Sequence, residues 1–228
     1  MDVGLVIFFA GTLTLTAFVA WASYRSAQML QQMGEVDFNL LLLPSENLLR
    51  LGMVLACLVF GWISGLPRDQ FGWISYAPLS DTAIGLGAGV AIQVPLNALT
   101  NWAVKRFGPQ IYSPVVIRSI LPHTQDEWPP ILLALFPAVL VEELLFRSLW
   151  LGGVGLFTPI PALVIGTALV FGWMHSPQGR LGVLMTGAVS VLLAGIFLWR
   201  ESLLPALVAH YVLNVLQLLI AHRHRNRL

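Results

Sequence analysis

The amino-acid sequence contains a series of long apolar runs, almost all of them free of charged side chains. Six of the seven runs reach the roughly 17–25 residues that a helix needs to cross the hydrocarbon core of a bilayer. A soluble fold must cover its surface with polar groups and cannot bury so many apolar stretches. The runs are Val3–Ala22, Leu51–Leu66, Thr82–Trp102, Ile131–Trp150, Thr158–His175, Leu181–Trp199 and Leu203–Ile220.

The overall composition agrees with a membrane protein. Of the 228 residues, 57% are hydrophobic and 10% are charged, whereas soluble domains have roughly 45–50% apolar and about 25% charged residues. The same values exclude disorder, and a formal net charge of +1 leaves no basic footprint for nucleic acid. We therefore predict an all-α fold, a polytopic transmembrane helical bundle, with residues 1–228 in a single integral membrane domain.

The number of spans is predicted as seven, with eight as the alternative. Leu51–Leu66 is the short run, and its helix can begin near Ser45, a suitable N-cap after Pro44. Phe38–Leu43 is too short to span alone, so it is expected to form an interfacial or re-entrant piece. An eighth span would have to be assembled from that piece.

The basic residues indicate how the chain is oriented, because Lys and Arg prefer cytoplasmic connections. With the N-terminus outside, nine of them fall in inside connections or the tail, and two, Arg68 and Arg200, fall in outside connections. We thus predict a cytoplasmic C-terminus. The basic tail, residues 221–228, is expected to contact anionic lipid.

Three charged side chains lie inside one predicted span: Glu142, Glu143 and Arg147. Each charge near a helix centre costs about 2.5–3.5 kcal/mol on insertion, so intramembrane charges indicate a functional site. Glu143 and Arg147 are four positions apart with the acid first, which favours an ion pair on one helix face. Glu142 projects in another direction and is predicted to be the unpaired carboxylate. A structural ion pair that pins neighbouring helices is the alternative role for Glu143 and Arg147.

Two further runs carry pairs of residues four positions apart, which share a helix face. Phe171 and His175 end one run, whereas His210 and Asn214 lie inside another. Because unsatisfied polar groups are costly within a bilayer, His210 and Asn214 are expected to converge on partners. Glu142 lies about 12 residues, roughly 18 Å, into its own run. Straight helices would place it and His175 at different depths, so we expect irregular or tilted helices, or a shifted boundary.

Two kinds of chemistry suit a free carboxylate, two imidazoles and an amide. In the first, Glu142, assisted by His175, takes a proton from the water that attacks a peptide carbonyl. His210 and Asn214 then donate hydrogen bonds to the oxyanion, and no cofactor is needed. In the second, Glu142, His175 and His210 bind a divalent metal such as zinc, which activates the water. The sequence has no Ser nucleophile elbow and no usable Cys–His pair, which disfavours covalent chemistry.

At these residues the sequence resembles the CPBP family, the CAAX proteases and bacteriocin-processing proteins. Its members include the type II CAAX prenyl endopeptidases, which are glutamate-type intramembrane proteases. The resemblance covers about residues 131–220, the predicted catalytic core, and one departure is Ser148, where many members have Gly. The three family motifs occur in order: Glu-Glu-x-x-x-Arg at Glu142, Glu143 and Arg147, Phe-x-x-x-His at Phe171 and His175, and His-x-x-x-Asn at His210 and Asn214.

The resemblance implies an intramembrane endopeptidase that cuts a membrane-associated protein or peptide and needs no bound metal. It also implies a multi-pass location in the plasma (inner) membrane, in contact with the lipid bilayer. The alternatives are a non-proteolytic membrane immunity or scaffold protein of the same fold, the zinc-dependent membrane protease, and a proton-coupled transporter. The implied roles are Glu142 as catalytic base, His175 as a water-holding residue, His210 and Asn214 as the oxyanion-stabilising pair, and Glu143, Arg147 and Phe171 as supporting residues.

Overall fold

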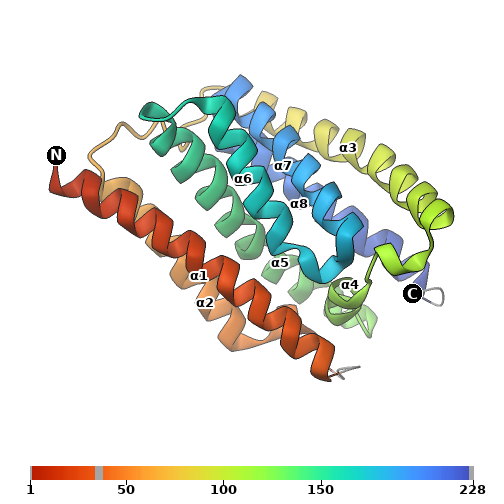
Figure 1. Cartoon of the computed structure of the whole chain (residues 1–228). Coiled ribbons are helices and arrows are strands. Elements are labelled where there is room, and N and C mark those ends of the chain that lie inside the picture. The colour runs from red at the N-terminus through yellow and green to blue at the C-terminus, as the bar shows by residue number, and fades with distance from the viewer. Residues whose placement is uncertain (1, 34–37, 226–228) are drawn as a thin grey trace.

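The computed structural model describes residues 2–33 and 38–225, and over these residues it contains helices and loops without any strand (Figure 1). The predicted all-α helical bundle is therefore confirmed. A short helix, α4 (Val115–Ile120), lies in the connection between α3 and α5. The longer helices are α1 (Val3–Met33), α2 (Pro44–Ile63), α3 (Pro78–Phe107), α5 (Trp128–Glu143), α6 (Ile160–Met174), α7 (Gly179–Arg200) and α8 (Leu203–Arg223). Helix α5 continues without a break into η4 (Leu144–Gly153), which has π-helical hydrogen bonding.

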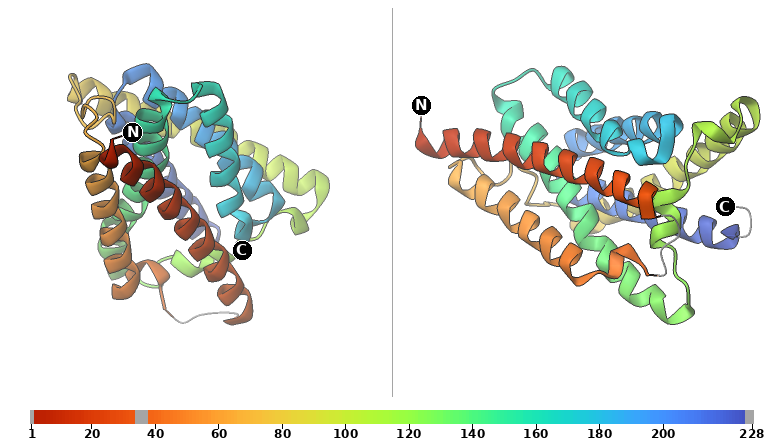
Figure 2. Two further views of the ribbon diagram at one scale, coloured as in Figure 1. Left: turned by 60° about the vertical axis from the view of Figure 1, so that its left-hand side comes forward. Right: turned by 60° about the horizontal axis from the view of Figure 1, so that its bottom comes forward.

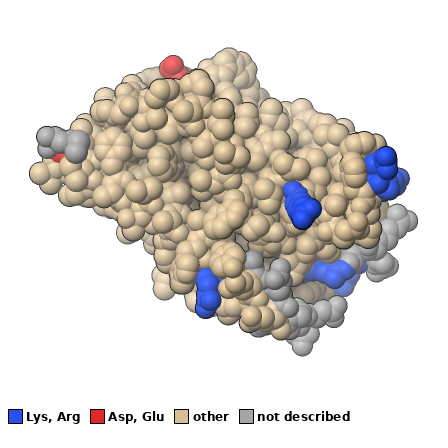
Figure 3. Space-filling model, in the orientation of Figure 1, with Lys and Arg blue, Asp and Glu red and all other residues tan. Residues whose placement is uncertain are grey.

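The protein is a multi-pass membrane protein. Six of the described helices are long and apolar enough to cross a bilayer. Their outward faces carry large apolar side chains, such as Leu79, Leu133 and Trp62, which are 88%, 76% and 75% exposed. Figure 3 shows one broad face with few charged side chains, on which the Lys and Arg side chains are gathered towards one side. This surface fits contact with lipid, in which exposed apolar groups carry no penalty.

One of the seven apolar runs, Thr158–His175, forms a helix shorter than these six. Helix α6 has 15 residues, or about 22 Å at 1.5 Å per residue, whereas a bilayer core is about 30 Å thick. Beside it, α5 with 16 residues and η4 with 10 form one longer helix. Because α6 is short, it ends at Met174, and Phe171 in its last turn packs on Phe146 of η4 with ring centroids 5.2 Å apart. The difference in depth expected for Glu142 and His175 is thus addressed by a short helix that packs against a longer one.

Prolines set several helix starts. Pro44 is the first residue of α2, after Leu43 as N-cap, so the suggested Ser45 cap is replaced by a proline start. Pro78 likewise begins α3. The fixed backbone of proline suits the first helical position, where its missing N–H is not needed. The segment Phe38–Leu43 holds a 3₁₀ turn, Leu40–Leu42 (η1), and no additional span.

The bundle has a central group of helices and two flanks. Helices α1 and α2 run side by side along one flank and α3 runs along the opposite one, with α5 to α8 between them (Figures 1 and 2). Helix α3 packs on α8 through small residues, since a Cβ at Gly85 or Gly89 would lie 2.6 or 2.7 Å from the Cβ of Val208 or Val212. Close packing through glycine is typical of membrane helices. The two termini lie at opposite ends of the bundle (Figure 1).

Candidate active site

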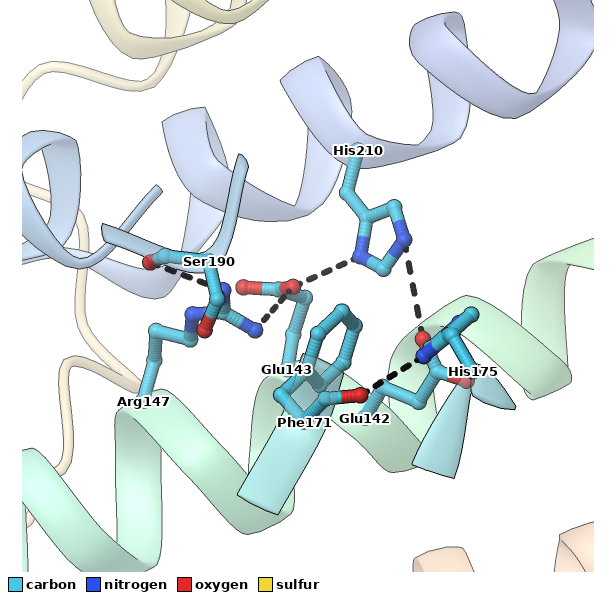
Figure 4. A network of polar contacts seen from close by, with 7 residues as sticks. All are labelled: Glu142, Glu143, Arg147, Phe171, His175, Ser190 and His210. Carbon is cyan, nitrogen blue, oxygen red and sulfur yellow. Dashed lines mark hydrogen bonds and ion pairs between the residues drawn. The ribbon is translucent and has the colours of Figure 1, made fainter. Parts of the chain in front are cut away.

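Four helical segments bring polar side chains together in the centre of the bundle. Glu142 and Glu143 come from the end of α5, Arg147 from η4, Ser190 from α7 and His210 from α8, and Figure 4 shows their contacts. Adjacent residues on a helix project about 100° apart. The two glutamates therefore face different surroundings although they are neighbours in sequence.

Glu143 forms a fully buried ion pair with Arg147. The Nη1 of Arg147 donates to Oε1 of Glu143 at 2.9 Å, and the two side chains are 0% and 1% exposed. The Nη2 of Arg147 donates to the backbone oxygen and to the hydroxyl of Ser190, at 3.2 and 3.1 Å. A buried charge pair needs such additional hydrogen bonds to offset its desolvation. The predicted pairing of Glu143 with Arg147 is present in the structure.

His210 lies between the two carboxylates. Its Nδ1 is 2.7 Å from Oε1 of Glu143, and its Nε2 is 3.5 Å from Oε2 of Glu142. A carboxylate only accepts hydrogen bonds, so Nδ1 donates to Glu143. The Nε2 can then donate as well only when the ring is an imidazolium.

Glu142 is the accessible carboxylate of the pair. Its side chain is 26% exposed, whereas that of Glu143 is fully buried. Arg50 on α2 lies close enough to Glu142 for their opposite charges to interact. The guanidinium of Arg50 is otherwise held by its own helix, at 3.4 Å from Oδ1 of Asn47 and 3.6 Å from Oε2 of Glu46. Glu142 is thus the acid that a water molecule or a substrate can reach.

Phe171 of α6 lies in the middle of the charged side chains. Its ring centroid is 4.7 Å from that of His175 and 6.0 Å from that of His210. The guanidinium carbon of Arg147 lies 5.2 Å from the same ring, in a cation–π arrangement. Phe171 is 2% exposed, so it separates these groups from one another and excludes water between them.

His175 caps the C-terminus of α6 and its ring folds back along the helix. Its Nδ1 lies 2.8 Å from the backbone oxygen of Phe171 (Figure 4). A carbonyl oxygen only accepts, so Nδ1 carries the proton. When the ring is neutral, Nε2 is then its acceptor nitrogen. Pro177 follows two residues later and is incompatible with a continuing helix.

Asn214 stands apart from this network. It lies one turn after His210 on α8 and is half-buried. Over the described part of the chain, no hydrogen bond or ion pair joins Asn214 to another side chain of the site. The structure therefore brings together six of the seven motif residues, through direct contacts, and places Asn214 on the adjoining turn.

Ser190 is a site residue that the sequence analysis missed. It is 2% exposed and accepts two hydrogen bonds from Arg147. A serine inside an apolar span gives no sequence signal, because its hydroxyl can be satisfied by its own helix backbone. Only the partner across the helix interface identifies its role.

The alternative metal ligands do not form a metal site in this geometry. Within residues 2–33 and 38–225, no group of three His, Cys, Asp or Glu side chains is arranged to hold a metal ion. Because Nδ1 of His210 contacts Glu143, any ligand role of His210 would fall to its Nε2.

The fold and the site together define a class: a multi-pass membrane protein with a carboxylate–imidazole site inside its helical bundle. Residues 124–216 match the family model described as type II CAAX prenyl endopeptidase Rce1-like. This segment contains all seven motif residues, and the match confirms the resemblance found in the sequence. That family is a protease family, and the match therefore supports a hydrolase activity for this chain. No curated protein and no solved structure matches the chain.

Proposed function

We propose that this protein is an intramembrane glutamate-type endopeptidase that hydrolyses a peptide bond in a membrane-associated protein or peptide. The observation that carries the proposal is that the two neighbouring glutamates differ in burial and in their partners. Glu143 is fully buried and paired with Arg147, whereas Glu142 is 26% exposed and faces Nε2 of His210. An accessible carboxylate beside a histidine is an arrangement that suits a general base.

In the proposed first step, Glu142 takes a proton from a water molecule as the water oxygen attacks the peptide carbonyl carbon. His175 helps to hold this water, since its Nδ1 is occupied by Phe171 and, when the ring is neutral, its Nε2 is the acceptor nitrogen. The C–O bond forms, the carbonyl π electrons move to oxygen, and a tetrahedral oxyanion results. Glu142 then returns the proton to the leaving nitrogen as the C–N bond breaks.

His210 and Asn214 are the proposed donors to the oxyanion. With Nδ1 donating to Glu143, the imidazolium form of His210 presents an Nε2–H to the space beside Glu142. Asn214 lies one turn further along the same face of α8, and its amide can add a second donor. Donors fixed before the reaction stabilise the developing charge without reorganisation.

Glu143, Arg147 and Phe171 support the reacting groups in this proposal. Glu143 fixes the tautomer and orientation of His210 through the 2.7 Å contact at Nδ1. Arg147 neutralises Glu143, and Phe171 holds both imidazoles apart. No step of this route requires a metal ion.

The proposed location is the plasma (inner) membrane, with the C-terminus in the cytoplasm. The bias of Lys and Arg supports this orientation, and residues 1–228 are proposed to act as one integral membrane domain. The catalytic core then comprises residues 131–220. The tail from residue 221 onwards is proposed to lie at anionic lipid headgroups.

The test is a comparison of membrane-protein termini in cells that carry the wild-type chain, Glu142→Gln or no chain. The proposal expects at least one precursor to accumulate uncleaved with Glu142→Gln, as it does without the chain. Glu201→Gln, an exposed glutamate at the end of α7, is the matched control and is expected to behave as wild type. If Glu142→Gln fully rescued the defect of cells that lack the chain, the result would contradict the proposal and favour a scaffold or immunity protein.

A further inference from the structure

The loop between α2 and α3 is seated on the ends of three helices that carry site residues. We call residues 64–77 the α2–α3 loop. Although it connects two flanking helices, its centre is buried: Phe71 is 0% exposed, and the ring of Trp73 stacks on that of Phe71 at 5.0 Å. A loop with a buried aromatic centre needs partners for its backbone polar groups.

Ser148, the residue after Arg147, is the first attachment point. Its hydroxyl donates to the backbone oxygen of Phe71 at 2.8 Å and accepts from Nε1 of Trp73 at 2.7 Å. Ser148 is 0% exposed, so these hydrogen bonds are sheltered from water. One hydroxyl thus satisfies two groups of the loop and ties both to the helix segment that bears Arg147.

The loop backbone also approaches η4 and α8 closely. A Cβ at Gly152 would lie 2.3 Å from the backbone oxygen of Gln70, so only glycine lets the loop touch η4 there. The backbone N–H of Leu203, the first residue of α8, donates to the oxygen of Gly72 at 2.9 Å. Gly72 has φ +69°, and a Cβ there would lie 2.6 Å from Phe197.

An ion pair at the end of the loop attaches α7. Arg200, the last residue of α7, donates through Nε to Oδ1 of Asp81 on α3 at 2.8 Å. The other oxygen of Asp81 accepts from Ser75 of the loop at 2.6 Å. Asp81 is 1% exposed. The loop therefore joins η4, α7 and α8, the segments that carry Arg147, Ser190 and His210.

We propose that the α2–α3 loop is a positioning element for the active site, with Ser148 as the positioning residue that sets η4 against α7 and α8. This inference rests on the proposed function and adds to it a segment that touches none of the reacting groups. The hydrogen bond from Arg147 to Ser190 joins η4 to α7, and that from His210 to Glu143 joins α8 to the last residue of α5, directly before η4. A shift of η4 would lengthen both, and displacements of about 1 Å can cost 10²-fold in rate.

The test uses Trp73→Phe and Ser148→Ala in the full-length protein, reconstituted in lipid nanodiscs. Trp73→Phe removes one donor and keeps the ring stack. Trp62→Phe is the matched control, since Trp62 is exposed on the neighbouring α2 and a phenyl ring keeps the aromatic face beneath Arg68 of the loop. The substrate is the precursor that accumulates with Glu142→Gln. Trp73→Phe and Ser148→Ala are both expected to lower kcat by about 10-fold or more with KM unchanged, whereas Trp62→Phe leaves both constants unchanged.

A second readout does not depend on catalysis. In protein labelled with ¹⁵N-histidine, the signals of His210, assigned by their loss in His210→Gln, report the hydrogen bond between Nδ1 and Glu143. Trp73→Phe and Ser148→Ala should shift these signals, and Trp62→Phe should not. Unchanged His210 signals or an unchanged kcat in both Trp73→Phe and Ser148→Ala, with only a lower Tm, would overturn the inference. If Glu142→Gln cleaves normally, the proposed function fails, while the His210 signals still decide the positioning role.

Discussion

At the scale of single residues, burial separates the roles of neighbouring acids. Oε1 of Glu143 accepts hydrogen bonds from both Arg147 and His210, and the side chain is fully buried. Glu142, one position earlier, remains open and faces the second nitrogen of His210. A buried ion pair is worth little compared with a well-packed apolar pair, but removal of one partner leaves an uncompensated charge. The pair is thus a means of orienting His210 rather than a source of stability.

We therefore predict that mutations at Glu143 and Arg147 change the free energy of unfolding in a strongly non-additive way. Arg147→Met should lower the free energy of unfolding by about 3–5 kcal/mol, because it leaves the buried charge of Glu143 without its guanidinium partner. Glu143→Gln combined with Arg147→Met should cost less than the sum of the single changes. SDS titration of the purified protein measures these free energies.

The pair Glu46–Arg50 is the control for this cycle, since it has the same i,i+4 spacing at 3.6 Å but side chains that are 41% and 17% exposed. Arg50→Gln should cost only about 0–1 kcal/mol. Additive effects at Glu143 and Arg147 would show that the buried pair is not coupled, and would contradict its role as a unit.

At the scale of helices, the packing of α3 on α8 depends on glycines along one face of α3. A Cβ at Gly85 would lie 2.7 Å from the backbone oxygen of Pro205 and 2.6 Å from the Cβ of Val208. A backbone atom cannot move aside as a side chain does. Gly87, on the same helix, has open space where its Cβ would be.

Gly85→Ala and Gly87→Ala should therefore change stability in opposite directions. Gly85→Ala is expected to destabilise the protein by about 1–3 kcal/mol, the usual range for overpacking. Gly87→Ala is expected to stabilise it by about 0.4–1 kcal/mol, since alanine reduces the entropy of the unfolded chain without a clash. Thermal unfolding in one detergent compares the two, and equal Tm values would contradict the observed helix contact.

The helices and the candidate site could be predicted from the sequence to different extents. Apolar runs predicted the helices, and the charges of Glu142, Glu143 and Arg147 marked the site because charge within a span is costly. The π-helical stretch after Glu143 was not predicted, since the same residues suit an α-helix. The contacts of Ser148 with Phe71 and Trp73 were not predicted either, because they join positions more than 70 residues apart. Such contacts leave no local periodicity in the sequence.

At the scale of the whole molecule, the two ends of the bundle differ in charge. The ends of α3 and α8 carry Lys105, Arg106 and Arg223, and the start of α7 carries Arg180. The α2–α3 loop and the turn between α7 and α8 lie at the other end, near the N-terminus (Figure 1). The proposed orientation places the basic end in the cytoplasm.

Cysteine labelling tests this orientation. Cys57 is buried and is the single cysteine of the chain, so Cys57→Ala provides an unreactive background. In that background, Asp69→Cys should react with a membrane-impermeant maleimide in intact cells, and Lys105→Cys should react only after the membrane is opened. The reverse pattern would contradict the orientation without affecting the site.

The rate of peptide-bond cleavage by purified protein in lipid vesicles tests the central claim most directly, because no other cellular protease is present. The substrate is the precursor that accumulates with Glu142→Gln, and the compared proteins are wild type, Glu142→Gln and Glu201→Gln. A general base contributes about 10²–10⁴-fold to the rate. We predict a loss of that size for Glu142→Gln and the wild-type rate for Glu201→Gln. Cleavage by Glu142→Gln at the wild-type rate would contradict the assignment of Glu142 as the base.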